Sequence, residues 1–236
     1  MSDYKYSLGI DIGGTNTVFG LVDGGQIIKK SSILTNSNKM PELLFENIFN
    51  KIKIWEVELG LPDIIKDIGV GVPNGNYFTG MVVSPPNLGK DWDELNLVSL
   101  IKSYKNIPVA ITNDANAAAL GEKYYGVAKS MNDVVVITLG TGLGSGIIVN
   151  NNILYGHDGF AGELGHLVIE PKGRDCGCGR KGCLEMYVSA KGISYTIKEY
   201  IKNYPENSFL QKLGNKNIDV IVLKTPAICF TKSFVI

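Results

Sequence analysis

Three of the chain's four cysteines, Cys176, Cys178 and Cys183, lie within eight residues of one another, and His166 lies shortly before them. Three thiolates and one imidazole form the closed tetrahedral ligand set of a structural Zn²⁺ site. The glycines between the cysteines permit the tight turns that such a loop needs. A metal-free loop and a redox pair are the alternatives, but Cys-x-Cys is not the Cys-x-x-Cys redox pattern. The cluster therefore predicts structural zinc.

Two acidic residues flank this cluster. Glu163 lies three residues before His166, and Glu185 lies two residues after Cys183. A loop braced by a metal would hold both carboxylates firmly enough to bind a polyhydroxyl ligand. The alternative is that both are solvated surface glutamates, as most glutamates are. The fourth cysteine, Cys229, stands apart and is typical of a small hydrophobic residue rather than a ligand.

Two glycine-rich turns, at 11–16 (DIGGTN) and 139–146 (LGTGLGSG), each follow an apolar segment. Backbone N–H groups in such turns can bind phosphate, and Asp11 could hold a hydrated Mg²⁺ beside it. A single turn of this kind is better explained as a β-hairpin that needs glycine. Two turns, each containing a threonine, favour a nucleotide clamp. Neither turn has the P-loop or Rossmann spacing.

Asp114 lies between an apolar segment and an alanine-rich stretch, at the junction of a predicted strand and a predicted helix. One interpretation is helix N-capping, for which Asp and Asn are favoured. The other is catalysis: the carboxylate would accept the proton of a substrate hydroxyl during phosphoryl transfer. Asn113 would then bind a neighbouring hydroxyl. The two interpretations are equally consistent with this stretch.

Hydrophobic periodicity predicts the elements that position these residues. An opening β-meander is followed by alternating helices and strands, which predicts an α/β chain with a mostly parallel sheet and an antiparallel start. The expected domains are 1–112, with the first phosphate loop, and 113–236, with the second phosphate loop and the zinc loop. The predicted strands are 6–12, 16–22, 26–34, 67–72, 108–112, 133–139 and 145–149, and the predicted helices are 41–59, 95–104, 115–125 and 184–204.

Composition narrows the class of protein. The chain has 236 residues, of which 44% are hydrophobic, so disordered classes are excluded. Basic and acidic residues both number 23, and this zero net charge gives no support for nucleic-acid binding. The N-terminal residues show neither a signal peptide nor a transmembrane span, so a cytoplasmic protein is expected.

The motifs at 11–16, 113–122 (NDANAAALGE), 139–146 and 161–185 (AGELGH…CGCGRKGCLE) together resemble the ROK family of sugar kinases and related repressors. The resemblance covers residues 6–200. It implies the actin-like ATPase (ribonuclease H-like) fold, with two α/β lobes and a ligand cleft between them. It also implies sugar and ATP as ligands, Mg²⁺ and Zn²⁺ as metals, and a homodimer.

The resemblance also assigns roles to individual residues. Asp114 would be the general base that deprotonates the sugar 6-hydroxyl, and His166 would bind zinc through one ring nitrogen while the same ring contacts sugar. The stretches 156–166 and 176–185 are most similar to glucokinases, so glucose is the expected substrate, with N-acetylmannosamine and fructose as alternatives. The other sugar-binding residues would be Gly75, Asn76, Asn87, Asn113, Glu163 and Glu185; the nucleotide would be held by Asp11, Gly13, Gly14, Thr15, Gly140, Thr141 and Gly142.

The C-terminal residues depart from the family pattern. ROK kinases continue through further helices to an Ile-Gly-Gly-Gly-type segment near the adenine, and residues 219–236 lack both features. The stretch is typical of a shifted reading frame or a truncated gene, which predicts an incomplete nucleotide lobe. The first alternative to a kinase is therefore an inactive remnant that binds sugar and zinc without turnover. The second, a sugar-sensing repressor, is disfavoured because its helix-turn-helix domain would precede the first phosphate loop.

Overall fold

The computed structural model describes residues 5–203 and 234–235. By its contacts the chain forms two compact units. Unit 1 is Met1–Ala117 with Tyr155–Phe160, and unit 2 is Ala118–Leu154 with Ala161–Ile236. The division expected from sequence, 1–112 and 113–236, stays a prediction about the whole protein.

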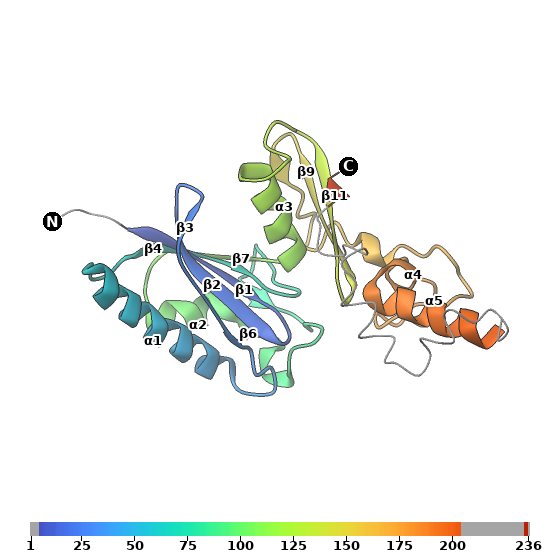
Figure 1. Cartoon of the computed structure of the whole chain (residues 1–236), viewed down its shortest axis with the longest axis horizontal. Coiled ribbons are helices and arrows are strands. Elements are labelled where there is room, and N and C mark those ends of the chain that lie inside the picture. The colour runs from blue at the N-terminus through green and yellow to red at the C-terminus, as the bar shows by residue number, and fades with distance from the viewer. Residues whose placement is uncertain (1–4, 204–233, 236) are drawn as a thin grey trace. The chain divides into compact units, whose positions relative to one another are not determined.

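Unit 1 is built on a five-stranded sheet in the order β3-β2-β1-β4-β7 (Figure 1). The first three strands form the predicted antiparallel meander, and the last two run parallel to β1. The strands are β1 (Tyr6–Ile12), β2 (Asn16–Asp23), β3 (Gln26–Leu34), β4 (Ile65–Gly71) and β7 (Val109–Thr112).

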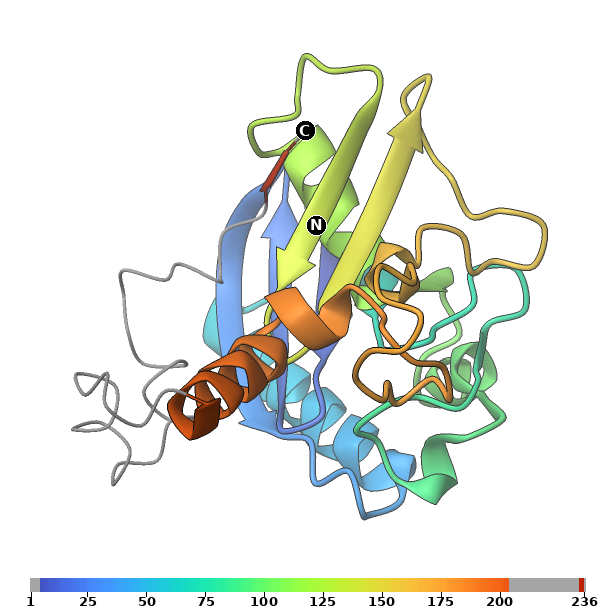
Figure 2. The ribbon, with the colours of Figure 1, turned by 90° about the vertical axis from the view of Figure 1, so that its right-hand side faces the viewer.

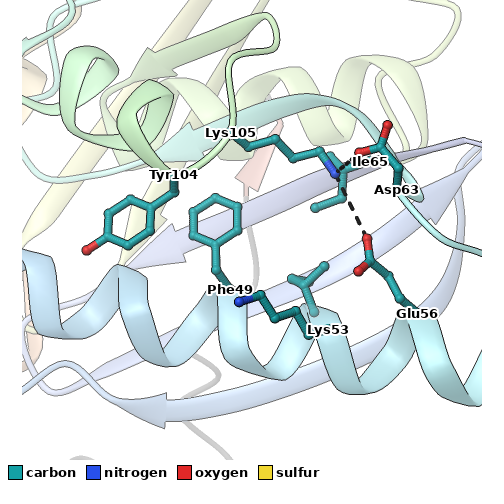
Figure 3. Close-up of a pocket in the computed structure, with 8 residues that line it drawn as sticks. Phe49, Lys53, Glu56, Asp63, Ile65, Tyr104 and Lys105 are labelled. Atoms are coloured by element: carbon teal, nitrogen blue, oxygen red, sulfur yellow. Dashed lines mark ion pairs between the residues drawn. The ribbon is translucent and has the colours of Figure 1, made fainter.

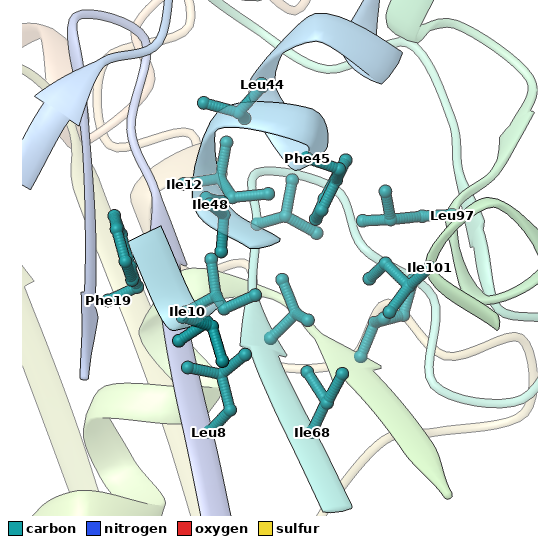
Figure 4. Close-up of a cluster of buried hydrophobic side chains, with 14 of the residues drawn as sticks. Leu8, Ile10, Ile12, Phe19, Leu44, Phe45, Ile48, Ile68, Leu97 and Ile101 are labelled. Carbon is teal, nitrogen blue, oxygen red and sulfur yellow. The ribbon is translucent and has the colours of Figure 1, made fainter. Parts of the chain in front are cut away.

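Helices α1 (Pro41–Leu59) and α2 (Leu97–Tyr104) pack on this sheet and close the main hydrophobic core (Figure 4). Leu8, Ile10 and Ile12 of β1 are buried in that core. Side chains alternate between the two faces of a strand, so Asp11 points to the opposite face, away from the core. The burial pattern of β1 thus leaves one acidic side chain available outside the core.

Unit 2 contains the antiparallel hairpin of β8 (Val134–Leu139) and β9 (Leu143–Val149), which is visible in Figure 2. Its small core joins Ala119 of α3 (Asp114–Tyr124) to Val136 and Ile148 of the hairpin. The remaining elements of unit 1 are β5 (Met81–Val82), η1 (Lys90–Trp92) and β6 (Leu95–Asn96). Those of unit 2 are β10 (Asn152–Ile153), η2 (Leu164–His166), α4 (Glu185–Val188), α5 (Ala190–Asn203) and β11 (Phe234–Val235).

The structure corrects the expected continuity of one helix and the expected direction of the strands. The predicted helix at 184–204 is interrupted at Ser189, which is extended (ψ 167°) and whose hydroxyl accepts the Gly192 N–H at 3.1 Å, so α5 starts afresh there. Position 204 lies outside the described residues, as does most of 219–236. The sheet is also not mostly parallel: among the described strands only β1–β4 and β4–β7 pair in parallel. Within the described ranges, no helix is long and apolar enough to cross a bilayer.

A surface pocket of about 370 Å³ lies between α1, β4 and the end of α2 (Figure 3). The Phe49 and Tyr104 rings stack on one side of it, with centroids 5.1 Å apart. Lys105 lies on the other side and pairs with Asp63 at 2.6 Å and with Glu56 at 4.0 Å. None of the sugar- or nucleotide-binding residues predicted from sequence lines this pocket.

Candidate active site

The predicted site residues of unit 1 gather at one edge of the sheet. Strands β1, β4 and β7 run parallel, and Asp11, Gly71 and Thr112 pair across them in one row. The loops that follow these strands therefore leave the sheet at the same carboxyl edge, which is where open α/β sheets bind ligands. The first glycine turn, the loop with Gly75 and the Asn113–Asp114 pair all begin there.

Asn113 is the N-cap residue of α3, and Asp114 is the first residue of that helix. The Ala115 N–H donates to Oδ1 of Asn113 and to Oδ1 of Asp114, each at 2.8 Å. The Ala117 N–H donates to the Asn113 carbonyl at 3.0 Å. The capping interpretation is thus confirmed for Asn113, whereas Asp114 lies within the first turn of the helix. Capping does not compete with the catalytic interpretation, because the capping bonds fix the position of the Asp114 carboxylate at the carboxyl edge.

Two carboxylates share this region. Surrounding protein atoms desolvate the Asp114 carboxylate, although the side chain keeps solvent contact, and this desolvation raises its pKa above the ordinary value of 3.8. Desolvation, with a contribution from the nearby Asp114 charge, also raises the pKa of Asp11. A carboxylate that prefers to take up a proton is suited to act as a base, and an adjacent pair of acids is suited to a divalent cation.

Gly71 keeps the space between these acids open. A Cβ added at Gly71 would lie 3.1 Å from Cβ of Ala117, 3.7 Å from Cα of Asp114 and 3.8 Å from Oδ1 of Asp11. Because no side chain stands there, the start of α3 can approach β4 closely. Sequence reasoning missed Gly71, and the signal was its place at the end of an apolar strand.

The first glycine turn is hydrogen-bonded to Thr35, and it packs against the loop that contains Asn87. The Thr35 hydroxyl donates to the Gly13 carbonyl at 2.6 Å, and the Thr35 N–H donates to the Thr15 carbonyl at 2.9 Å. A Cβ on Gly14 would lie 2.8 Å from both Cβ and the carbonyl oxygen of Asn87. The structure thus brings the predicted phosphate turn and the predicted sugar-binding Asn87 into contact.

Gly75 and Asn76 lie in the loop after β4. A Cβ on Gly75 would lie 2.6 Å from Cγ1 of Val72 and 2.9 Å from the Thr112 carbonyl oxygen, so the loop presses against the end of β7. Asn76 is only 4% exposed, and its side-chain amide is bonded to the protein backbone. Direct contact of either residue with sugar stays a prediction.

In unit 2, the predicted metal ligands come together. The donor atoms of His166, Cys176, Cys178 and Cys183 all lie within 4.8 Å of one another. Nδ1 of His166 is 3.6 Å from Sγ of Cys176, and Sγ of Cys178 is 3.7 Å from Sγ of Cys183. A tetrahedron with Zn–S and Zn–N bonds of about 2.3 and 2.0 Å has S···S and N···S edges of about 3.8 and 3.5 Å. The donor set fits zinc, whereas the S···S distance excludes a disulfide.

Arg174 anchors the predicted zinc loop, residues 166–183, to the helices that follow it. Its Nη1 donates to the carbonyls of Met186 at 2.7 Å and of Gly192 at 2.9 Å. Its guanidinium carbon lies 4.7 Å from the centre of the Tyr187 ring, a cation–π contact. The cluster is therefore fixed to α4 and to the start of α5.

Glu185 connects the zinc loop with the second glycine turn. Its Oε2 accepts the Leu143 N–H at 3.0 Å, and its Oε1 lies 4.0 Å from Sγ of Cys176. The Ala190 N–H donates to the Gly140 carbonyl at 3.0 Å. Glu185 is half-buried, so the alternative of a solvated surface acid is wrong for this residue, whereas Glu163 is exposed.

A matched pair of glycine substitutions tests this connection. A Cβ on Gly142 would collide with Oε2 of Glu185, whereas one on Gly140 would meet nothing within 4 Å. Gly142→Ala should displace the flexible Glu185 carboxylate and weaken sugar binding by about tenfold, the loss of one charge-assisted hydrogen bond. Gly140→Ala should leave it unchanged. Titration calorimetry with glucose measures both, and equal affinities in the two variants would contradict a sugar-binding role for Glu185.

Comparison with known proteins assigns the chain and its fold to one family. The ROK family model matches residues 7–223, so the chain belongs to the ROK family. A crystal structure of a ROK family glucokinase from Streptomyces griseus, in complex with glucose and AMPPNP, superposes with a TM-score of 0.69 at 34% identity, covering 91% of this chain and 67% of that one. This likeness confirms the predicted α/β, actin-like ATPase fold.

Glucokinases and repressors are both among the curated relatives. A glucokinase of Halalkalibacterium halodurans is 37% identical over 212 residues, covering 88% of this chain and 63% of that protein. A xylose repressor of Bacillus spizizenii is 36% identical over 196 residues, covering 82% of this chain and 50% of the repressor. The chain thus spans about two thirds of the glucokinase and half of the repressor.

Proposed function

We propose that the protein phosphorylates a hexose with ATP, converting glucose to glucose 6-phosphate, with Asp114 as the general base. The observation that carries this proposal is the Asp114 carboxylate at the carboxyl edge of the sheet, with a pKa raised by desolvation. The similarity to glucokinases supports a sugar substrate, and the AMPPNP complex of the S. griseus enzyme supports ATP as the donor.

In the proposed reaction, Asp114 takes the proton of the sugar 6-hydroxyl as that oxygen attacks the γ-phosphorus. The bond between the γ-phosphorus and the β,γ-bridging oxygen breaks, and ADP leaves with the electron pair. Mg²⁺, held near Asp11, would neutralise charge on the phosphates. In the first glycine turn, the Gly13 N–H already donates to the Asn16 carbonyl at 3.0 Å. We therefore assign phosphate binding to the backbone N–H groups of Gly14 and Thr15.

Five of the predicted sugar-binding side chains would bind the sugar hydroxyls. These side chains are Asn87, Asn113, Glu163, His166 and Glu185. We also propose that the cluster of His166 and the three cysteines holds one structural Zn²⁺. The distances within the cluster support this assignment, and the ion would fix His166 and the neighbouring Glu185 in place. A cytoplasmic homodimer stays a prediction.

A second candidate function is sugar sensing without turnover. The 36% identity to a xylose repressor supports it, because both kinases and repressors share this fold and region of sequence. Fold alone does not decide between them.

A coupled ADP-release assay with glucose, N-acetylmannosamine and fructose tests the proposal. We expect turnover with glucose and a lower kcat/KM with the other two sugars. Calorimetry with glucose and xylose on the same preparation separates the alternatives. Sugar binding without ADP release would support the sensor or the inactive remnant and contradict the kinase.

A further inference from the structure

The segment Tyr155–Phe160 belongs to unit 1 by its contacts, although the residues on both sides of it belong to unit 2. The chain therefore leaves unit 2 after β10, contacts unit 1 for six residues, and returns at Ala161. Glu163 and His166, two of the proposed sugar-binding residues, follow directly. What holds this short segment on unit 1 therefore matters for the sugar site.

The Asn76 side chain is the first part of the attachment. Its Nδ2 donates to the Asp158 carbonyl at 2.6 Å, and its Oδ1 accepts the N–H groups of Phe78 at 3.0 Å and Thr79 at 3.1 Å. Gly159 packs directly on this amide. Its φ is +90°, and a Cβ there would lie 2.7 Å from Nδ2 of Asn76. A buried amide with three backbone partners fixes both chain segments at once.

An aromatic stack is the second part of the attachment. The Tyr77 and Tyr155 rings are parallel within 4°, with centroids 4.4 Å apart. The Phe78 ring meets the Tyr155 ring edge-on at 5.7 Å. Tyr77 is 48% exposed and Phe78 is 57% exposed, so the stack lies at the surface and is not part of the main core. Substitution of Tyr77 should therefore leave the fold of unit 1 intact.

We infer that Asn76 and the Tyr77–Tyr155 stack, here called the loop clamp, are positioning residues of the sugar site: they hold segment 155–160 on the unit that carries Asp114. This inference rests on the proposed function for its effect on sugar. Three residues of extended chain span at most about 11 Å, so Glu163 lies no further than that from Phe160. Because the clamp holds the segment that ends at Phe160 on unit 1, it restrains how far Glu163 can move from that anchor. Release of the clamp removes that restraint and lowers sugar affinity without touching the base.

The matched variants Tyr77→Ala and Tyr77→Phe test the clamp. Tyr77→Ala removes the stacked ring, and the amides of segment 155–160 should exchange hydrogen at least about tenfold faster than in the wild type. Tyr77→Phe keeps the ring and should exchange at the wild-type rate. Wild-type exchange in Tyr77→Ala, or equally fast exchange in both variants, would overturn the role of the stack. Asn76→Asp keeps Oδ1 but loses the donor to Asp158, so it should also exchange faster; unchanged exchange would overturn the role of Asn76.

The effect on sugar is measured separately. Tyr77→Ala should raise the glucose KM and Kd by about tenfold while kcat at saturating glucose stays within about twofold of the wild type, because Asp114 is untouched. A fall in kcat with an unchanged KM would overturn the positioning role. If the wild-type protein binds no glucose, the proposed function is wrong. The hydrogen-exchange experiment still tests separately whether the loop clamp holds segment 155–160. Equal zinc contents confirm that unit 2 is intact in each preparation.

Discussion

Asp114→Asn should abolish turnover while leaving glucose binding measurable. The amide keeps the oxygen that accepts the Ala115 N–H, but it cannot take the proton of the sugar hydroxyl. Loss of a positioned general base lowers kcat by about 10²- to 10⁴-fold. The coupled assay gives kcat, and titration calorimetry on the same preparation gives the glucose Kd, which we expect to change by less than about tenfold.

The control variant is Asp23→Asn, the same chemical change at an exposed position at the end of β2. It should retain wild-type kcat. The melting temperature of Asp114→Asn at pH 7 should not fall below that of the wild type. Because the folded-state pKa of Asp114 is raised, the stability that this residue contributes is present at low pH and is lost as the pH rises through that pKa. At pH 7 the ionised carboxylate is therefore unfavourable for folding, and an uncharged amide removes that charge. Wild-type turnover in Asp114→Asn would exclude this residue as the base.

The second large effect is expected at the zinc loop. Purified protein should contain about one zinc per chain, and Cys183→Ser should contain none. Cys183 is fully buried and its thiol is one of the four clustered donors, so the loop loses both its metal and its anchor. Structural zinc contributes about 10–16 kcal/mol of apparent binding free energy in zinc-finger peptides, so the loop should unfold locally and become open to proteolysis.

Metal analysis and limited proteolysis check this expectation. Cys229→Ser makes the same change outside the predicted ligand set and should keep its zinc and its protease resistance. Glucose affinity should fall in Cys183→Ser, because His166 and Glu185 lose the support of the loop. A wild-type protein without zinc, or a Cys183→Ser variant that retains it, would contradict the structural metal site.

Local pattern was sufficient to predict most elements. β1, β3 and α1 begin and end where the sequence predicted, because alternation and helical periodicity were sustained over whole segments. The break at Ser189 was missed because a buried serine that caps a new helix resembles an ordinary polar residue within a helical pattern. The predicted start of α2 was two residues too early. Leu95 and Asn96 instead form a short strand that pairs with β5, and two residues are too few to show a periodic pattern.

Part of the candidate site was also predictable from local sequence pattern, and part was not. The cluster of His166 and the three cysteines was predictable because three thiols and an imidazole in one stretch have few other uses, and the structure brings their donor atoms together. Contacts between distant segments were not predictable. The hydrogen bond from Leu143 to Glu185, the packing of Gly14 on Asn87 and the bond from Asn76 to the Asp158 carbonyl join residues far apart in sequence. They exist only once the whole chain has folded, so a local sequence pattern does not reveal them.

The pH dependence of kcat/KM for glucose tests the central claim most directly. Asp114 must be ionised to accept the hydroxyl proton, and desolvation raises its pKa above 3.8. We therefore predict that kcat/KM falls about tenfold per pH unit on the acid side, with a midpoint above pH 3.8, while circular dichroism shows the protein still folded. A rate that stays constant through this range in folded protein would contradict proton transfer to Asp114.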